Sequence, residues 1–295
     1  MNAKPSCMAP DPNTKVPSFK APPNACDAHC HVFGPAHLFP YHESSRYIPP
    51  DAGKERLKTL HTILGIERAV IVQASCHGPD NRAMLDAIAS SQGSYRGVCL
   101  GRKQFTDNDF IDLHVGGVRG IRFNFVAHLG GAPDLDEMKG ILDRLIGLGL
   151  GWHLVIHVNA EDIVAYEDFF SMFEIPIVVD HMGRVPTHLG LEQPAFQILI
   201  DFMRRDNWWV KICGAERIST AGPPFYDAVP YAQALIKAAP DRVLWGTDFP
   251  HPNIKKHMPN DGDLLDLVPL FTDDPTIQQK ILVDNPARLY GFDNA

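Results

Sequence analysis

The chain has 295 residues and a formal net charge of −8 at pH 7, with 45% hydrophobic and 21% charged residues. This length suffices for one large domain or two ordinary ones, and the composition is typical of a folded globular protein rather than a disordered chain. The negative charge argues against nucleic acid or an anionic membrane surface as the main partner.

The first 24 residues are rich in proline and lack the apolar core of a signal peptide. We interpret residues 1–24 as an extended arm, lying along the rest of the protein or along a neighbouring subunit, and residues 25–295 as one domain. No run of the sequence has the length and apolarity of a membrane span. The six cysteines form no CxxC pair, which favours free thiols in a reducing compartment. We therefore expect a cytoplasmic protein, with its oligomeric state left open.

Eight short apolar or β-branched runs follow one another along the chain at intervals of roughly 20–40 residues, as βα units require. The predicted strands are 26–33, 68–75, 95–101, 118–125, 152–158, 175–181, 208–214 and 242–249. Segments with a helical period fill the intervals and follow the last strand. The predicted helices are 54–64, 80–92, 106–116, 134–148, 161–173, 193–205, 227–239 and 275–284.

This alternation predicts an α/β fold, a single-domain (β/α)8 TIM barrel. A doubly wound open sheet is the alternative, but no Gly-x-Gly-x-x-Gly turn follows the first strand. In a barrel the active site lies at the carboxyl ends of the strands, and polar or titratable residues gather there. They are His29, His31, Ser75, His77, Arg122, Asn124, His128, His157, Asp180, His181, Arg184, Arg217, Asp248, His251 and Asn253. This convergence predicts an enzyme.

Some of these residues have a simpler interpretation. His77, His251 and Asn253 could equally cap loops, and Asp180 could orient a histidine rather than touch a ligand. Four further histidines fall in helical or loop contexts and are expected at the surface; they are His61, His114, His188 and His257. His29 and His31 share one face of their strand because side chains alternate along it.

Several local segments carry a family resemblance. They are "DAHCHVFGP", "SRYIPPDAG", "VIVQASCHGPDN", "GIRFNF", "VDHMGR", "AGPP" and "WGTDFPHPN". With these segments the chain resembles the amidohydrolase superfamily and, within it, the pyrone-dicarboxylate lactonases, from about residue 25 to its end. The resemblance implies a hydrolase acting on a small polyanionic unsaturated lactone in aromatic-compound catabolism, first of all on 2-pyrone-4,6-dicarboxylate, giving 4-oxalomesaconate.

The resemblance also implies roles for single residues. Asp248 would be the general base that activates water, and His29, His31 and His181 would polarise the lactone carbonyl. The substrate-binding positions would be Tyr47, Ser75, Arg122, His128, His157, Arg184, Arg217 and Asn253. Two of them depart from the family pattern, which has an arginine at His128 and a tyrosine at His157. The first change weakens the case for gripping a second carboxylate, and the second reopens the question of a metal.

Hydrolysis of a lactone needs an activated water and stabilisation of the charge that develops on the carbonyl oxygen. Clustered imidazoles can donate to that oxygen or hold a metal that does the same work. The resemblance favours catalysis without a cofactor. The ligand types leave one zinc as the alternative, held by His29, His31, His157 and Asp248. A second metal is not expected, because no lysine ends the fourth predicted strand.

Three other functions are compatible with the sequence. One is a related lactonase, acting on a sulfomuconolactone or a sugar-acid lactone. Another is a zinc-dependent decarboxylase of the same superfamily. The third is a barrel that binds an aromatic acid without reaction, which would leave Asp248 among imidazoles unexplained.

Overall fold

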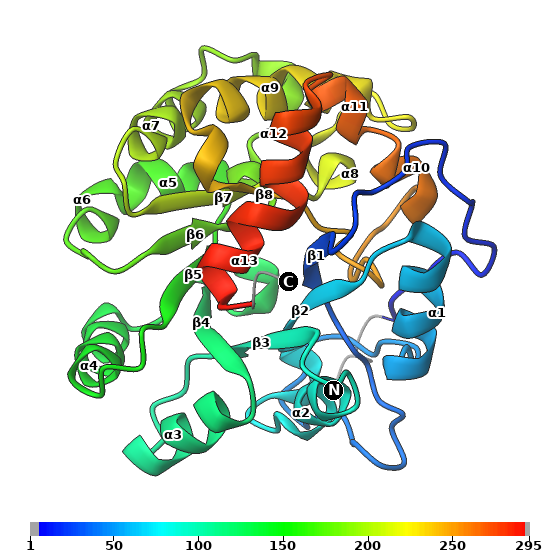
Figure 1. Cartoon of the computed structure of the whole chain (residues 1–295). Helices are drawn as coiled ribbons and strands as arrows, with labels where there is room; N and C mark the ends of the chain where they lie inside the picture. The colour runs from blue at the N-terminus through cyan, green and yellow to red at the C-terminus, as the bar shows by residue number, and fades with distance from the viewer. Residues whose placement is uncertain (1–5, 293–295) are drawn as a thin grey trace.

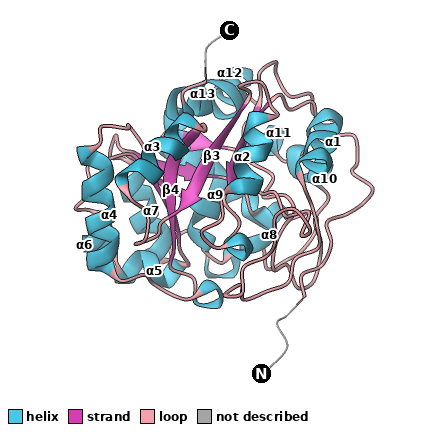
Figure 2. Cartoon of the chain, turned by 90° about the horizontal axis from the view of Figure 1, so that it is seen from below, coloured by secondary structure: helices cyan, strands magenta, loops and turns pink. Residues whose placement is uncertain are grey.

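The computed structural model describes residues 6–292 of the chain, and its centre is a ring of eight parallel strands in the order β1 to β8 (Figure 1). The strands are β1 (Cys26–Cys30), β2 (Arg68–Val72), β3 (Tyr95–Leu100), β4 (Val118–Asn124), β5 (His153–His157), β6 (Ile177–Val179), β7 (Trp208–Lys211) and β8 (Val243–Leu244). Figure 2 shows the helices around the outside of this sheet. The predicted (β/α)8 barrel is confirmed.

Backbone hydrogen bonds at the seam between β1 and β8 bring the ring close to closure. The Ala28 amide donates to the Trp245 carbonyl over 2.9 Å, and the His31 amide donates to the Phe249 carbonyl over 2.7 Å. Between them, the Asp248 amide donates to the His29 carbonyl over 2.7 Å. The closure of the barrel therefore places His29 beside Asp248 through the main chain alone.

All eight strands are shorter than predicted, chiefly at their carboxyl ends. The predicted strand 242–249 is reduced to Val243–Leu244, and 175–181 to Ile177–Val179. Beyond these ends the backbone leaves the extended region, with φ of 53° at His181 and 64° at Asp248. Positive φ is uncommon for non-glycine residues, and such residues gather at functional sites. The apolar runs thus continue past the ladder, and the residues after it turn across the mouth of the barrel.

Most of the predicted helices are present within a few residues of their expected ends. They are α1 (Lys54–Leu64), α2 (Arg82–Ala89), α3 (Asp107–Val115), α4 (Leu135–Gly147), α7 (Pro194–Met203) and α9 (Val229–Ala238). The predicted helix 161–173 is two helices, α5 (Ala160–Ala165) and α6 (Glu167–Phe170). The last one, 275–284, is α12 (Pro275–Gln279), which continues through a π-helical turn into α13 (Asn285–Tyr290).

Three further helices were not predicted, α8 (Ala215–Ile218), α10 (Asp261–Leu265) and α11 (Val268–Phe271). Each is one turn or little more, too short to show a helical period in the sequence.

The interior of the barrel is a small apolar core that is closed at one end by α13. Its strand residues are mostly valines, and Ala287, Tyr290 and Phe292 pack against them from the last helix and the residues after it. In Figure 1, α13 lies across the opening of the ring. The amino end of the barrel is therefore sealed, which leaves the carboxyl ends of the strands free to form a site. All six cysteines are buried and free, as the sequence predicts.

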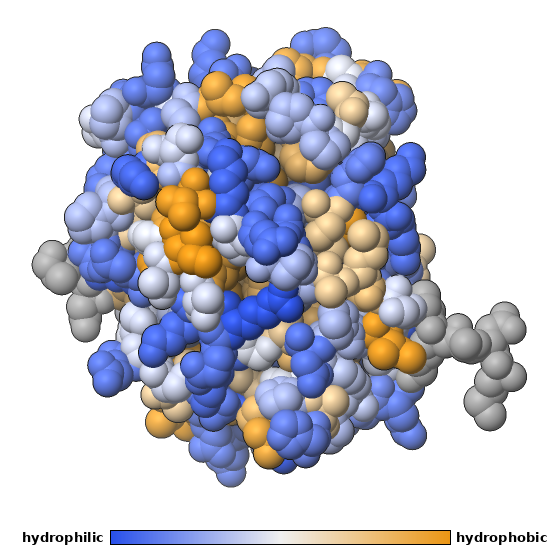
Figure 3. Space-filling view, turned by 90° about the vertical axis from the view of Figure 1, so that its right-hand side faces the viewer, coloured by the Kyte–Doolittle hydropathy of each residue, from blue (hydrophilic) through white to orange (hydrophobic). Residues whose placement is uncertain are grey.

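The segment from residue 6 to residue 24 lies along the protein's own barrel. Lys15 pairs with Asp263 and Asp266 at 2.6 and 2.8 Å, and the Phe19 amide donates to Asp266 over 2.8 Å. This side of the molecule is mostly hydrophilic, with small apolar patches (Figure 3). The division into an arm and a domain stays a prediction, and residues 1–5 lie outside the described part. Within residues 6–292, no helix combines the length and apolarity needed to cross a membrane.

Asp27 joins the two sides of the seam. One carboxylate oxygen accepts from the amides of His29 and Thr247, both over 3.0 Å. The other accepts from the Thr247 hydroxyl over 2.6 Å and lies 3.2 Å from His61 Nε2. The expectation that His61 lies at the surface is wrong, because its ring is buried between Asp27 and Tyr95. His188 and His257 are exposed, as expected.

We predict that Asp27→Ala lowers the free energy of unfolding by about 3–5 kcal/mol, because loss of the carboxylate leaves several buried donors without an acceptor. Urea unfolding followed by circular dichroism measures the change. Asp143→Ala is the matched control, since Asp143 is exposed and pairs with Lys139; its effect should stay below about 1 kcal/mol. Equal losses in the two variants would show that Asp27 does not hold the seam.

Candidate active site

The carboxylate of Asp248 is the centre of the mouth of the barrel. One of its oxygens, Oδ1, lies 3.3 Å from His31 Nε2, 3.5 Å from His29 Nε2 and 3.9 Å from His181 Nε2. The other, Oδ2, accepts hydrogen bonds from Nε and Nη2 of Arg217. One oxygen thus faces three imidazoles, while a guanidinium holds the other.

The surroundings of Asp248 keep it charged. Burial alone would raise its pKa, but Arg217 and the neighbouring histidines outweigh burial and hold the pKa well below the ordinary value. Burial lowers the pKa of His29 to about 4 and that of His181 well below its ordinary value. At neutral pH the centre is therefore a carboxylate beside neutral His29 and His181.

A second buried charge cluster lies behind His29. Asp180, which follows β6, has Oδ1 at 3.1 Å from Lys211 Nζ and at 3.2 Å from His29 Nδ1. Its Oδ2 accepts from Arg122 Nε over 2.7 Å. Burial would raise the pKa of Asp180, but Lys211, His29 and Arg122 lower it well below the ordinary value. Asp180 thus contacts His29. This is the position required by the interpretation in which Asp180 orients a histidine rather than touching a ligand.

Lys211 was not predicted as a site residue. Its Nζ lies 3.0 Å from His29 Nδ1, and its side chain is fully buried. The signal in the sequence was a single lysine inside the apolar run 208–214, where a charged side chain has to find partners in the barrel.

A small cavity of about 30 Å³ opens above Asp248, and ten of the twelve predicted site residues line it. They are His31, Tyr47, Ser75, Arg122, His128, His157, His181, Arg217, Asp248 and Asn253. Phe33 and Leu129, which the sequence did not single out, also line it. The exceptions are His29, which lies against Asp248, and Arg184, whose Nε donates to Asn159 over 2.9 Å.

The two positions that depart from the family pattern lie together on one side of this cavity. The rings of His128 and His157 are 6.4 Å apart. His157 Nδ1 lies 3.0 Å from Asn124 Oδ1, and its buried Nε2 has no hydrogen-bond partner within residues 6–292. Burial, with nearby arginines and Lys255, lowers the pKa of His128 to about 4. His128 is therefore neutral at pH 7 and offers no positive charge to an anion.

Two of the three residues with a possible loop-capping role have partners away from the cavity. His77 Nε2 accepts from the Gly34 amide over 3.1 Å, and His251 Nε2 lies 3.0 Å from Asp261 Oδ1. Burial would lower the pKa of His251, but Asp261 and Glu216 raise it to about 10. Neither histidine lines the cavity, whereas Asn253 does.

A groove of about 370 Å³ continues from the cavity. It shares Ser75, Arg122 and Leu129 with the cavity and is also lined by Arg46 and Arg102. Arg102 is half-buried, and its buried Nε has no hydrogen-bond partner within residues 6–292. The groove thus adds two arginines, a residue type suited to carboxylate ligands, to the residues that surround the cavity.

The predicted zinc ligands are only partly brought together. Within the described residues, His29, His181 and Asp248 each offer one ligand atom in a group spanning at most 4.8 Å. His181 stands in this group where the sequence suggested His31 and His157. The ring of His157 lies 5.4 Å from that of His181, with its Nδ1 toward Asn124.

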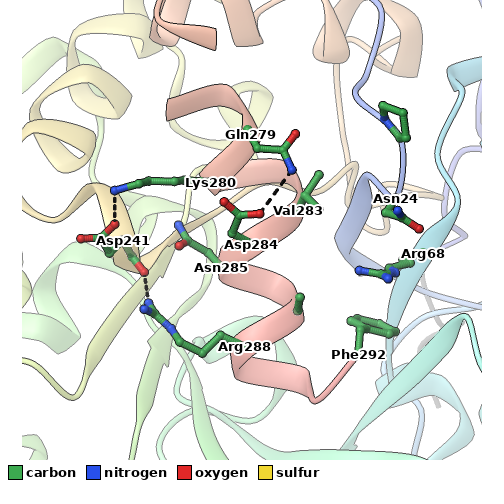
Figure 4. Close-up of a pocket in the computed structure, with 12 residues that line it drawn as sticks. Asn24, Arg68, Asp241, Gln279, Lys280, Val283, Asp284, Asn285, Arg288 and Phe292 are labelled. Carbon is green, nitrogen blue, oxygen red and sulfur yellow. Dashed lines mark hydrogen bonds and ion pairs between the residues drawn. The ribbon is translucent and has the colours of Figure 1, made fainter. Parts of the chain in front are cut away.

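Another cavity, of about 650 Å³, lies at the opposite end of the barrel beside α13 (Figure 4). Three of the charged residues that line it contact each other. Lys280 pairs with the Asp241 carboxylate at 2.5 Å, and Arg288 donates to the Asp241 backbone carbonyl. Its position under the sealed end of the barrel separates it from the chemistry described above.

Comparison with known proteins gives matches over nearly the whole chain. The family model described as Amidohydrolase matches residues 26–292. A 2-pyrone-4,6-dicarboxylate hydrolase of Comamonas testosteroni is 46% identical over 287 residues, which cover 94% of this chain and 93% of the relative. A 4-sulfomuconolactone hydrolase of Rhizobium radiobacter is 42% identical and is covered to 96%, with 97% of this chain matched.

A solved structure shares the fold over a similar extent. It is a probable 2-pyrone-4,6-dicarboxylic acid hydrolase from Acinetobacter baumannii with citric acid bound, and it is 25% identical. The superposition has a TM-score of 0.78 and covers 91% of this chain and all of that one.

Proposed function

The chain belongs to the amidohydrolase family, and we propose that it is a lactonase for a small polyanionic lactone, with 2-pyrone-4,6-dicarboxylate as the first candidate. The observation that carries the proposal is the Asp248 carboxylate, with three imidazoles on one oxygen, at the base of a pocket lined by arginines. The names of the two relatives, both lactone hydrolases, support the same reaction class.

In the proposed reaction, Asp248 Oδ1 accepts a proton from water while the water oxygen attacks the lactone carbonyl carbon. The negative charge that develops on the carbonyl oxygen is stabilised by imidazole N–H groups. The ring C–O bond then breaks, and its oxygen leaves as an enolate that takes the proton from Asp248 and becomes an enol. Addition of one water thus opens the ring and creates one new carboxylic acid, which releases its proton to solvent as a carboxylate.

Arg217 links substrate binding to the strength of this base. In the free protein its guanidinium lies on Asp248 and holds the pKa of that carboxyl low, which makes a weak base. Arg217 also lines the cavity, so a substrate carboxylate beside it would offset part of its positive charge. The pKa of Asp248 then rises toward its ordinary value only when substrate is bound.

The acid groups of the substrate need cations that are free to bind them. Arg122 lines the cavity but uses its Nε for Asp180, and His128 is neutral. We infer that Arg122 takes one acid group and that Arg102, with Arg46 nearby in the groove, takes the other. Citric acid in the related structure is likewise a polycarboxylate. The same arginines suit a sulfonate, which keeps a sulfomuconolactone as the second candidate substrate.

The residues fit a zinc ion poorly. The group of His29, His181 and Asp248 is compact enough, but two cations already flank it. Arg217 holds Asp248, and the Lys211 ammonium lies closer to His29 Nδ1, at 3.0 Å and within hydrogen-bonding geometry, than the Asp180 carboxylate, at 3.2 Å. A ligating histidine normally gives its second ring N–H to a carboxylate or carbonyl, not to an ammonium. We therefore propose hydrolysis without a metal, which also disfavours the zinc-dependent decarboxylase.

The first test is hydrolysis of 2-pyrone-4,6-dicarboxylate by the purified protein in a chelator, followed by loss of the pyrone absorbance. Asp248→Asn should lower kcat by at least about 10³-fold with substrate binding retained, because the amide keeps the shape but cannot take the proton. Asp263→Asn, an exposed site on α10, is the control and should keep full activity. A variant at Asp248 that kept more than about a tenth of the rate would rule out this base.

The second test concerns the groove. Arg102→Met should raise KM for the pyrone diacid by about tenfold or more and change kcat little, because it removes a charged partner of an acid group that does not react. An uncharged pyrone ester should lose nothing. Arg82→Met, an exposed arginine paired with Asp80, is the control. The same loss for the charged and uncharged substrates would exclude Arg102 as an acid-binding residue.

A further inference from the structure

Lys211 is the last residue of β7, and its ammonium is enclosed inside the barrel with none of its side chain exposed. A buried lysine is costly unless it is paired and hydrogen-bonded. Its two partners are Asp180 Oδ1 at 3.1 Å and His29 Nδ1 at 3.0 Å. The chain therefore keeps a buried cation in direct contact with one histidine of the catalytic centre.

We propose that Lys211 is a positioning residue that fixes His29 in the tautomer with its proton on Nε2. A lysine ammonium has three donors and no acceptor. At 3.0 Å it can hydrogen-bond His29 Nδ1 only if that nitrogen carries a lone pair. A neutral imidazole carries one proton, so the proton then lies on Nε2, the nitrogen that faces Asp248.

The competing arrangement is less favourable. Asp180 Oδ1 lies 3.2 Å from His29 Nδ1 and could accept a proton from it. Two donors, the ring N–H and the ammonium, would then face each other across 3.0 Å. The charge of Asp180 is balanced without the histidine, because the Lys211 ammonium forms an ion pair with Oδ1 at 3.1 Å and Arg122 hydrogen-bonds Oδ2.

The other histidine of the first strand is held differently. His31 Nδ1 lies 2.8 Å from the Val72 carbonyl oxygen, which can only accept, so Nδ1 of His31 carries a proton. In His29 the same ring nitrogen faces the Lys211 ammonium instead. The nitrogen turned away from Asp248 thus contacts an acceptor in His31 and a donor in His29.

The His29 donor lacks an acceptor of its own. Nε2 is buried and has no hydrogen-bond partner within residues 6–292, and Asp248 Oδ1 is 3.5 Å away. A buried N–H without an acceptor is unfavourable, and a lactone carbonyl oxygen would supply one. The role of this N–H rests on the proposed function: Lys211 fixes the proton on Nε2, and the Nε2–H group then stabilises the oxyanion.

The test is the tautomer of His29, read from the 15N shifts of its ring in two-bond 1H–15N spectra of the full-length protein. The His29→Gln variant assigns the signals by their loss. The parent should show the proton on Nε2, and Lys211→Met should move it to Nδ1, where Asp180 can accept it. Lys139→Met, a surface change on α4, should leave the tautomer unchanged. A proton on Nδ1 in the parent would overturn the proposal even if Lys211→Met failed to fold.

Kinetics separate this role from a merely structural one. Lys211→Met should lower kcat for the lactone by about 10²-fold and change KM by less than about threefold, as expected for a lost oxyanion donor. An unchanged kcat alongside a shifted tautomer would refute the donor role of His29. Since the spectra need no substrate, a failure of the proposed lactonase activity would leave the tautomer result intact and be recognised separately.

Discussion

The contacts of the Asp248 carboxylate organise the mouth of this barrel. Arg217 takes one oxygen, and the Nε2 atoms of His29, His31 and His181 surround the other. The same residues close the fold, because the Asp248 amide binds the His29 carbonyl across the seam. The hydrogen bond that closes the barrel thus also brings Asp248, the proposed base, beside His29, and a change that loosened the seam would move Asp248 away from its histidines.

The charges around the centre agree with the proposed hydrolysis without a metal. Lys211, Arg122 and Arg217 bring three positive charges, which pair with the three buried carboxylates of Asp180, Asp248 and Glu216. Such buried pairs stabilise little in themselves because desolvation offsets attraction. They do fix the arrangement of the site, because each of these three cations pairs with a carboxylate and Lys211 also contacts His29. The acid groups of an anionic substrate would instead meet the arginines of the groove, Arg46 and Arg102.

The sequence was sufficient for the architecture and for most of the mouth. Apolar runs with a βα period identify eight strands, and the parallel barrel sends their carboxyl ends to one place, so His31, Arg122, His157 and Asp248 could be grouped without coordinates. It was insufficient where the outcome depends on packing across the barrel. Asp27 and His61 are far apart in the sequence but meet in the core beside the seam. Lys211 is a single charge in an apolar run and was not singled out, and only the register of β6 and β7 places it beside Asp180 and His29.

The most direct measurement of the central claim is the pH dependence of lactone hydrolysis, with kcat/KM and kcat determined separately between about pH 3 and pH 8. Only the carboxylate form of Asp248 can take the proton, so the rate falls as pH drops through its pKa. The account predicts that kcat/KM, which reports the free protein, stays level down to pH values near the ordinary aspartate pKa of about 3.9 and falls only below it. The fall in kcat should come at higher pH, because bound substrate offsets Arg217. A kcat/KM profile that instead falls with an apparent pKa of about 6–7 would contradict the account, because a histidine would then be the base.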